Sequence, residues 1–271
     1  MKISERMVAH LEQIISIAGQ AGAAILNYYN GHREIVAEYK EDHSPLTEAD
    51  KEANRIITDG LIKLASDIPV VSEENALLPY SVRQNWKTYW LIDPLDGTKE
   101  FINKNGEFTV NIALVENGRV VLSVVYAPAI GVFYYGDKNK GAFRRESGIT
   151  KKITVRKANP DNFIAVGSRS HKDSRSAELL NKIDVVTEKS VGSSLKFCMI
   201  AEGVADIYIR TGKTSEWDTA AAQGILEMAG GKVIREDGAE LLYNQKESIL
   251  NPGFIALGVV PDRIEKSLLP W

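Results

Sequence analysis

Two aspartates and a threonine stand close together in residues 93–100, which read Asp-Pro-Leu-Asp-Gly-Thr-Lys-Glu. The run follows residues 89–92, an apolar segment typical of a strand, so its carboxylates are expected at a strand end, on a turn shaped by Pro94 and Gly97. Crowded carboxylate oxygens are the ligands that Mg²⁺ prefers, and a Gly-Thr backbone beside them suits a phosphate. The run therefore predicts metal-assisted phosphoryl chemistry.

Three further carboxylates fall at the ends of predicted elements. Asp50 lies in the first turn of a helix, Glu73 follows a short strand, and Asp218 opens another helix. Each has an ordinary alternative, because Asp caps helices and Glu is common in exposed loops. Gathered at one point, they would raise one another's pKa unless a cation neutralised them. With the main-chain carbonyl of Leu95 as a further ligand, the set is what a two-metal phosphoester hydrolase needs.

The elements that must position these groups change in character along the chain. In the first half, helical periodicity is followed by an antiparallel meander, whose first hairpin turns at Asn117-Gly118. The expected elements of this half are helices over 4–30 and from 47 onwards, with Ser44-Pro45 as a start signal, a strand over 69–72, and strands between 109 and 144. In the second half, strands over 163–166, 205–209 and 254–257 alternate with helices over 174–182, 193–203 and 217–230.

This order predicts an α+β first half and an α/β second half, stacked as layers of helix and sheet. We expect an N-terminal lobe over residues 1–160, which carries most metal ligands, and a C-terminal lobe over 161–271, which contributes Asp218 and substrate contacts. No Gly/Ser/Pro-rich linker separates the two, so they should pack tightly as one structural unit.

Composition excludes several classes of protein. The chain has 271 residues, of which 44% are hydrophobic and 25% charged, so it can bury a core. The net charge of −3 argues against a general nucleic-acid coat and against a basic membrane-binding face. The single cysteine, Cys198, cannot form an internal disulfide, and its apolar neighbours predict a buried thiol.

No targeting or membrane segment is expected. Residues 1–6 carry charge and lack an apolar core, which argues against a signal peptide. The most apolar stretch, 120–135, is interrupted by Pro128 and Gly131 and reads as two strands and a turn. We therefore expect a cytoplasmic protein and leave peripheral association with the inner face of the cell membrane open. The sequence leaves the choice between monomer and homodimer open too.

Three segments together resemble the signatures of a known family. They are Ser72-Glu73-Glu74, the run at 93–98, and residues 217–221, which read Trp-Asp-Thr-Ala-Ala. Their order and wide spacing are similar to those of the inositol monophosphatase superfamily of lithium-sensitive, Mg²⁺-dependent phosphatases. The resemblance covers essentially the whole chain. It implies the layered α-β-α-β-α sandwich of the inositol monophosphatase and fructose-bisphosphatase type.

The resemblance also implies a role for each residue. Glu73, Asp93 and the Leu95 carbonyl would hold one Mg²⁺, and Asp93, Asp96 and Asp218 a second, with two or three ions in each site. Thr98, linked to Asp50, would orient the attacking water with help from Glu73, and the backbone N–H groups of Gly97 and Thr98 would hold phosphate oxygens. Glu73, Leu95, Asp96 and Asp218 would thereby also contact the substrate.

The flanking residues indicate a substrate branch. Lys99-Glu100-Phe101 stands where inositol monophosphatases typically carry Thr-Asn-Phe, and it looks like the branch that hydrolyses 3′(2′),5′-bisphosphate nucleotides. Three further segments resemble that branch, namely residues 40–47, 167–171 and 192–196. The resemblance implies removal of the 3′-phosphate from 3′-phosphoadenosine 5′-phosphate during sulfate assimilation or nucleotide recycling. An inositol or sugar phosphate phosphatase is the alternative enzyme, and a non-catalytic nucleotide sensor is the alternative outside enzymes.

A bisphosphate nucleotide needs a second phosphate site. Lys196 and Arg210 are the candidate cations, and hydrogen bonds could come from Ser193, Ser194, Ser170 or His171. The ordinary alternatives are a solvated helix residue for Lys196 and a surface loop for His171. The loop-rich segment 236–253 is expected near the substrate mouth, without an assigned role.

Overall fold

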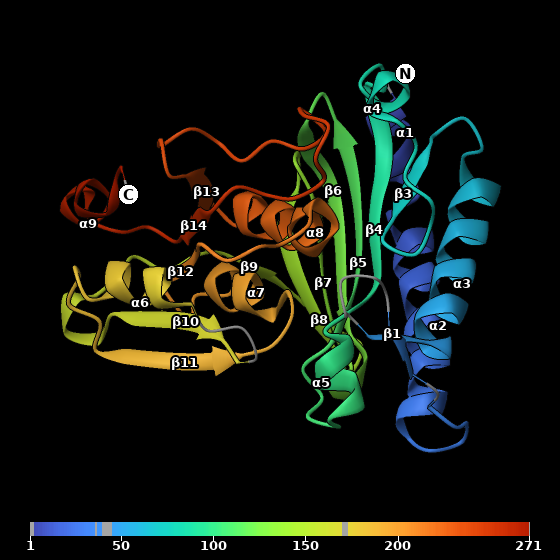
Figure 1. The fold of residues 1–271 in the computed structure, drawn as a ribbon, viewed down its shortest axis with the longest axis horizontal. Coiled ribbons are helices and arrows are strands. Elements are labelled where there is room, and N and C mark those ends of the chain that lie inside the picture. Colours follow the sequence, from blue (N-terminus) through green and yellow to red (C-terminus); the bar gives the residue numbers. More distant parts are fainter. Residues whose placement is uncertain (1–2, 36, 40–44, 170–172, 271) are drawn as a thin grey trace.

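The computed structural model describes residues 3–35, 37–39, 45–169 and 173–270. His171 and Ser170 lie outside these residues, as do most of residues 40–47. The described chain folds into alternating layers of helix and sheet (Figure 1). The side chains of Ala37 and Tyr39 are likewise not described.

The larger sheet of the described chain has seven strands, in the order β3-β4-β5-β6-β7-β8-β9. β3 and β4 are parallel, and every later pair is antiparallel. Asn117 and Gly118 both have positive φ, so the predicted tight turn between β5 and β6 is confirmed. The strands are β3 (Val70–Ser72), β4 (Thr88–Asp96), β5 (Thr109–Glu116), β6 (Arg119–Ala127), β7 (Val132–Asp137), β8 (Gly141–Glu146) and β9 (Ile149–Ile153).

Both faces of this sheet are covered, and successive side chains of a central strand point alternately to one face and the other. Trp90 and Ile92 of β4 point to one core, whereas Tyr89 and Leu91 point to the other. The first face packs against α2 (Leu11–Tyr29) and α3 (Glu48–Leu64), which lie beside each other on the right of Figure 1.

The second face of the sheet packs against α7 (Leu195–Ala201) and α8 (Glu216–Met228). The close approach of α8 depends on Gly224, because a Cβ there would lie 2.2 Å from Ser123 Oγ on β6. These two helices separate the larger sheet from a smaller one, as Figure 1 shows. One shared core therefore joins the two sheets.

Five strands of the described residues form the smaller sheet, in the order β11-β10-β12-β14-β13. β10 pairs in parallel with β11 and β12, and β14 runs antiparallel to its neighbours. Its outer face packs on Leu179 of α6 and Leu268 of α9. The strands are β10 (Ile164–Ser168), β11 (Thr187–Val191), β12 (Ile207–Arg210), β13 (Lys232–Arg235) and β14 (Phe254–Leu257), and the helices are α6 (Ser174–Leu180) and α9 (Asp262–Leu268).

The predicted α-β-α-β-α order is therefore confirmed. The remaining elements are short and lie at the ends of these layers. They are α1 (Ile3–Ala9), β1 (Ala37–Tyr39), β2 (Pro45–Thr47), α4 (Tyr80–Arg83), α5 (Thr98–Ile102) and two 3₁₀ turns, Pro128–Ile130 and Pro160–Asn162. Sheet membership changes between Ile153 and Ile164, and the division into lobes at residue 160 stays a prediction.

Three local expectations were wrong. The predicted helix over 4–30 is divided into α1 and α2, because His10 leaves helical geometry at φ −101° and ψ 12°. Pro45 does not open a helix but pairs in β2, and α3 begins after Thr47, whose side chain caps it. The aspartates of the 93–100 run do not follow a strand end, because β4 continues to Asp96 with an irregular register.

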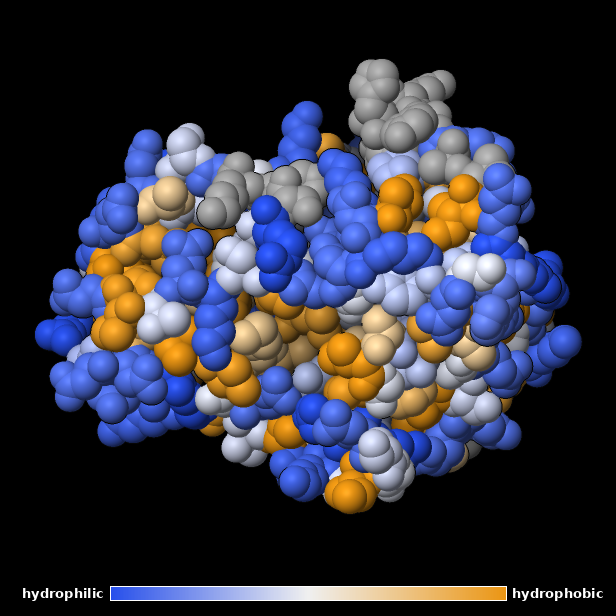
Figure 2. Space-filling view, turned by 90° about the horizontal axis from the view of Figure 1, so that it is seen from below, coloured by the Kyte–Doolittle hydropathy of each residue, from blue (hydrophilic) through white to orange (hydrophobic). Residues whose placement is uncertain are grey.

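Within the described ranges, no helix combines the length and the apolar character needed to cross a membrane. Seen from below, hydrophobic and hydrophilic side chains are interspersed over the molecule (Figure 2). Cys198 is buried, as the sequence predicts.

Candidate active site

A cavity opens where the end of β4 meets the first turns of α5, α7 and α8 and the end of β12. Residues from both halves of the chain line it. Most residues that the sequence indicates for chemistry are among them, namely Glu73, Asp93, Leu95, Asp96, Gly97, Thr98, Ser193, Lys196, Arg210 and Asp218.

Three carboxylates converge on one side of this cavity. Glu73, Asp93 and Asp218 each offer an oxygen, and these oxygens all lie within 4.8 Å of one another. Glu73 directly follows β3, Asp93 lies on the adjacent parallel strand β4, and Asp218 lies in the first turn of α8. Parallel pairing of β3 with β4 brings the first two together, and packing of α8 on the sheet adds the third.

The backbone of its own turn fixes one oxygen of each of three aspartates. Asp50 Oδ2 accepts from Thr47 N over 2.7 Å, and Asp218 Oδ2 accepts from Ser215 N over 2.9 Å, both in capping boxes. Asp93 Oδ1 accepts from Leu95 N over 3.1 Å. The capping alternative that the sequence left open for Asp50 and Asp218 is therefore true, and it orients their second oxygens rather than excluding a functional role.

Burial and mutual repulsion disfavour the charged forms of these carboxylates. Burial is the largest cause that raises the pKa of Asp93 and Asp218 well above the usual range, and repulsion by Glu73 and Asp96 adds to it. Burial also raises the pKa of Asp50 to about 6. Hard oxygen donors at this spacing suit a divalent cation, which would offset the repulsion. The donor set thus fits the metal that the sequence predicts.

Asp96 has different surroundings from the other three. Its Oδ2 accepts from Ser194 Oγ over 2.8 Å and from Asn111 Nδ2 over 3.4 Å, and Asn111 Nδ2 also donates to Ser194 Oγ over 2.8 Å. The group of carboxylates within 4.8 Å does not include it. Asp96 therefore lines the same cavity but is directed towards the first turn of α7.

Thr98 connects the cavity to Asp50. Its Oγ1 lies 3.2 Å from Asp50 Oδ1 and 3.2 Å from the carbonyl oxygen of Leu95. Asp50 is buried, so its carboxylate reaches the cavity through this hydroxyl. Gly97, which precedes Thr98, has φ 90°, and a Cβ there would lie 3.1 Å from Glu107 O and 3.2 Å from Ser193 Cβ. Only glycine fits this turn without strain.

The cavity is also lined by cations. Lys196 is 7% exposed and Arg210 is 8% exposed, so the alternative of a solvated Lys196 is wrong. Lys196 Nζ donates to Ser193 O over 2.6 Å, and Arg210 Nη2 donates to Lys213 O over 3.2 Å. Burial lowers the pKa of Lys196 to about 8, although Asp96 favours its charged form. Lys213, also on the cavity wall, is exposed.

Sequence reasoning missed two parts of this site. Asn111, which contacts Asp96, is a polar residue in an otherwise apolar strand, and that interruption was the available signal. Lys213 carried no signal, because its place on the wall depends on the turn after β12. His171 lies outside the described residues.

Known proteins are similar to this chain over nearly its whole length. The model of the inositol monophosphatase family matches residues 8–266. The 3′(2′),5′-bisphosphate nucleotidase CysQ of Salmonella typhimurium is 50% identical over 244 residues, which are 90% of this chain and 98% of that protein. Its Escherichia coli K12 counterpart is 48% identical with the same coverage. The crystal structure of CysQ from Bacteroides thetaiotaomicron superposes with a TM-score of 0.80 at 39% identity, covering 93% of this chain and 97% of that one.

Proposed function

The chain belongs to the inositol monophosphatase family, and on this basis we propose that it is a 3′(2′),5′-bisphosphate nucleotidase. Its substrate would be 3′-phosphoadenosine 5′-phosphate, and its products AMP and phosphate. One observation carries the proposal. A single cavity is lined both by carboxylates and by the cations Lys196, Arg210 and Lys213, here named its carboxylate side and its cation side. A substrate with two separate phosphates suits a cavity with both kinds of lining.

The two sides would divide the substrate's phosphates between them. The carboxylate side can take a phosphate only together with cations, because carboxylates repel it. The cation side can take one directly, since Lys and Arg donate charge-assisted hydrogen bonds to phosphate oxygens. Buried Lys196 favours this assignment, because an anion beside it would offset the cost of keeping its charge away from water. An inositol monophosphate has no second phosphate for this side.

The chain's own residues support hydrolysis by water. Thr98 Oγ1 and Asp50 Oδ1 form a hydroxyl–carboxylate pair at the cavity wall, which can orient a water and take up its proton, and Glu73 would assist. Glu73, Asp93, Asp218, Asp96 and the Leu95 carbonyl would hold Mg²⁺, with two or three ions in each site. Bound Mg²⁺ would supply charge neutralisation and a more acidic water. The N–H groups of Gly97 and Thr98 would face phosphate oxygens.

The decisive experiment is phosphate release with Mg²⁺ across a substrate panel. It compares 3′-phosphoadenosine 5′-phosphate with inositol 1-phosphate and fructose 1,6-bisphosphate. We expect the highest kcat/KM for the nucleotide, inhibition by Li⁺, and no release in EDTA. A higher kcat/KM for inositol 1-phosphate would favour the inositol phosphatase alternative. Tight binding of the nucleotide without phosphate release would favour the sensor.

The same proposal covers the cellular location and the oligomeric state of the enzyme. A substrate that is a small soluble nucleotide suits an enzyme in the cytoplasm, as monomer or homodimer. Fractionation of cells together with sedimentation of the purified protein tests both points. Recovery with washed membranes at physiological salt would instead support peripheral association.

A further inference from the structure

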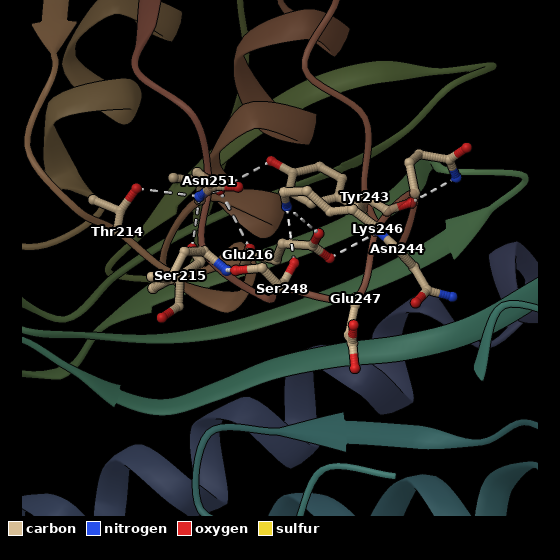
Figure 3. A network of polar contacts seen from close by, with 12 residues as sticks. Thr214, Ser215, Glu216, Tyr243, Asn244, Lys246, Glu247, Ser248 and Asn251 are labelled. Carbon is tan, nitrogen blue, oxygen red and sulfur yellow. Dashed lines mark hydrogen bonds and ion pairs between the residues drawn. The ribbon is translucent and has the colours of Figure 1, made fainter. Parts of the chain in front are cut away.

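Residues 243–251, here named the 243–251 strap, lie across the first turn of α8 (Figure 3). This segment falls in the loop-rich region 236–253, for which the sequence indicates no role. Its Asn251 donates from Nδ2 to Ser215 O over 2.7 Å and to Thr219 Oγ1 over 3.0 Å. Ile249 O accepts from Glu216 N over 2.9 Å. The strap thus holds the residues on both sides of the helix start.

The same helix start orients Asp218. Ser215 N donates to Asp218 Oδ2 over 2.9 Å, so the carboxylate follows any displacement of Ser215. Asn251 holds the carbonyl of that same Ser215. A change in the strap is therefore passed to Asp218 through a single residue, without any contact between the strap residue and the metal ligand.

Glu216 anchors the strap from the helix side. It is 1% exposed, yet its Oε2 accepts from Asn244 N over 2.8 Å and its Oε1 pairs with Lys246 Nζ over 3.3 Å. Lys246 Nζ also donates to Ser248 O over 3.0 Å. A buried carboxylate with this many partners is costly to disturb, because each lost partner leaves it desolvated and unpaired.

Arg83 links the strap to the connection that follows Glu73. It lies on α4, in the connection that begins at Glu73 and leads into β4. Its guanidinium donates to Asn244 Oδ1 and to Glu247 O, and its carbonyl accepts from Asn244 Nδ2 over 2.6 Å. Arg83 is 2% exposed. The strap thus ties the connection after Glu73 to the helix that carries Asp218.

We propose that the 243–251 strap is a positioning element for the metal site, in which Asn251 and Glu216 hold Asp218 in register with Glu73 and Asp93. The inference rests on the proposed function, because it assumes that Asp218 is a metal ligand. Support of this kind around a ligand keeps it oriented before the metal arrives, and its loss weakens metal binding.

The test measures Mg²⁺ binding by isothermal titration calorimetry, independently of activity. Glu216→Gln keeps the side chain's size but weakens its bond to Lys246, and Asn251→Ala removes the amide that holds Ser215. We expect the Mg²⁺ dissociation constant to rise about 10- to 100-fold in Asn251→Ala and in the same direction in Glu216→Gln. At saturating Mg²⁺, the KM for the nucleotide should stay within about twofold of the native value. Should Glu216→Gln not fold, Asn251→Ala decides alone.

A matched control separates positioning from general loss of stability. Asp206→Asn also alters a buried carboxylate, which is 1% exposed and pairs with Arg156 over 2.6 Å, but the hydrogen bonds of this carboxylate are to Arg156 and Ile164 N rather than to the first turn of α8. It should lower the Tm and leave the Mg²⁺ dissociation constant unchanged. Native Mg²⁺ affinity in both Glu216→Gln and Asn251→Ala overturns the inference. Undiminished Mg²⁺ binding in Asp218→Asn would instead overturn the ligand assignment in the proposed function.

Discussion

Thr98 Oγ1 lies 3.2 Å from Asp50 Oδ1, although 48 positions separate the two residues in the chain. The contact joins the first turn of α3 to the first turn of α5. This hydrogen bond holds the Thr98 hydroxyl, which lies on the cavity wall, next to the Asp50 carboxylate. A water placed beside Thr98 would therefore meet a hydroxyl that also contacts a buried carboxylate.

The first prediction concerns this pair. Thr98→Val keeps the shape of the side chain but removes the hydroxyl, so kcat should fall about 100-fold or more. Mg²⁺ affinity should change little, because the Glu73, Asp93 and Asp218 cluster is untouched. Single-turnover phosphate release and Mg²⁺ titration measure the two effects. Thr98→Ser restores the hydroxyl and should recover most of the rate; equal rates in the Val and Ser variants would contradict the role of the hydroxyl.

The second prediction is that Asp93 lowers the stability of the metal-free protein but is needed for Mg²⁺ binding. Its pKa is raised in the folded protein, so the stability that it contributes is present at low pH and is lost as the pH rises. At pH 7 in EDTA, Asp93→Asn should therefore raise the Tm. The same variant should lose Mg²⁺-induced stabilisation, and its kcat/KM should fall about 100-fold or more.

Differential scanning fluorimetry in EDTA and in Mg²⁺ tests this prediction. The exposed Asp237→Asn is the control, and its Mg²⁺-induced rise in Tm should equal that of the native protein. A lower Tm for Asp93→Asn in EDTA would mean that repulsion is not what limits the stability of this site.

The third prediction concerns the cation side. Lys196→Met should raise the KM for 3′-phosphoadenosine 5′-phosphate by about tenfold or more, since a charge-assisted hydrogen bond is lost. The KM for 3′-AMP, which lacks the second phosphate, should change much less. Steady-state kinetics on the two substrates gives the comparison, and equal effects on both would place Lys196 at the scissile phosphate instead.

The fourth prediction follows from the pKa of the same lysine. Burial lowers that pKa to about 8, so Lys196 is charged below this pH and loses its charge as the pH rises through it. The KM for the bisphosphate should therefore rise between about pH 7 and pH 9 in the native protein. Lys196→Met should lose this rise. A native KM that stays flat over this range would show that the charge on Lys196 does not contribute to substrate binding.

The fifth prediction uses two glycines with similar backbone conformations. Gly97 has φ 90° beside Glu107 O and Ser193 Cβ, whereas Gly31 has φ 80° with open space around its Cβ position. Alanine at either position should cost about 1–2 kcal/mol of unfolding free energy, because left-handed backbone disfavours a side chain. Only Gly97→Ala should also lower kcat/KM, since it displaces the turn that carries Thr98. Urea unfolding and phosphate release measure the two effects, and equal activity losses would contradict the local explanation.

Much of the fold was readable from the sequence because its cues are local. The apolar run at the start of β4, the turn at Asn117-Gly118 and the capping of α3 by Thr47 depend on neighbouring residues. Edge strand β11, with the mostly polar sequence Thr-Glu-Lys-Ser-Val, was missed because an edge strand needs little apolar alternation. The break at His10 was missed because apolar residues continue on both sides of it.

For the site, the sequence by itself determined the kind of chemistry. Its acids stand close to turns and helix starts, in combinations that suit Mg²⁺ and phosphate, and this pattern is visible in short segments such as 93–100. Only the tertiary structure decided which of these side chains lie next to one another. It directs Asp96 towards Ser194, 98 positions away, and joins Arg83 to Asn244 across 161 positions. Such pairings depend on how helices and sheets pack against one another, and no local pattern of residue types encodes that.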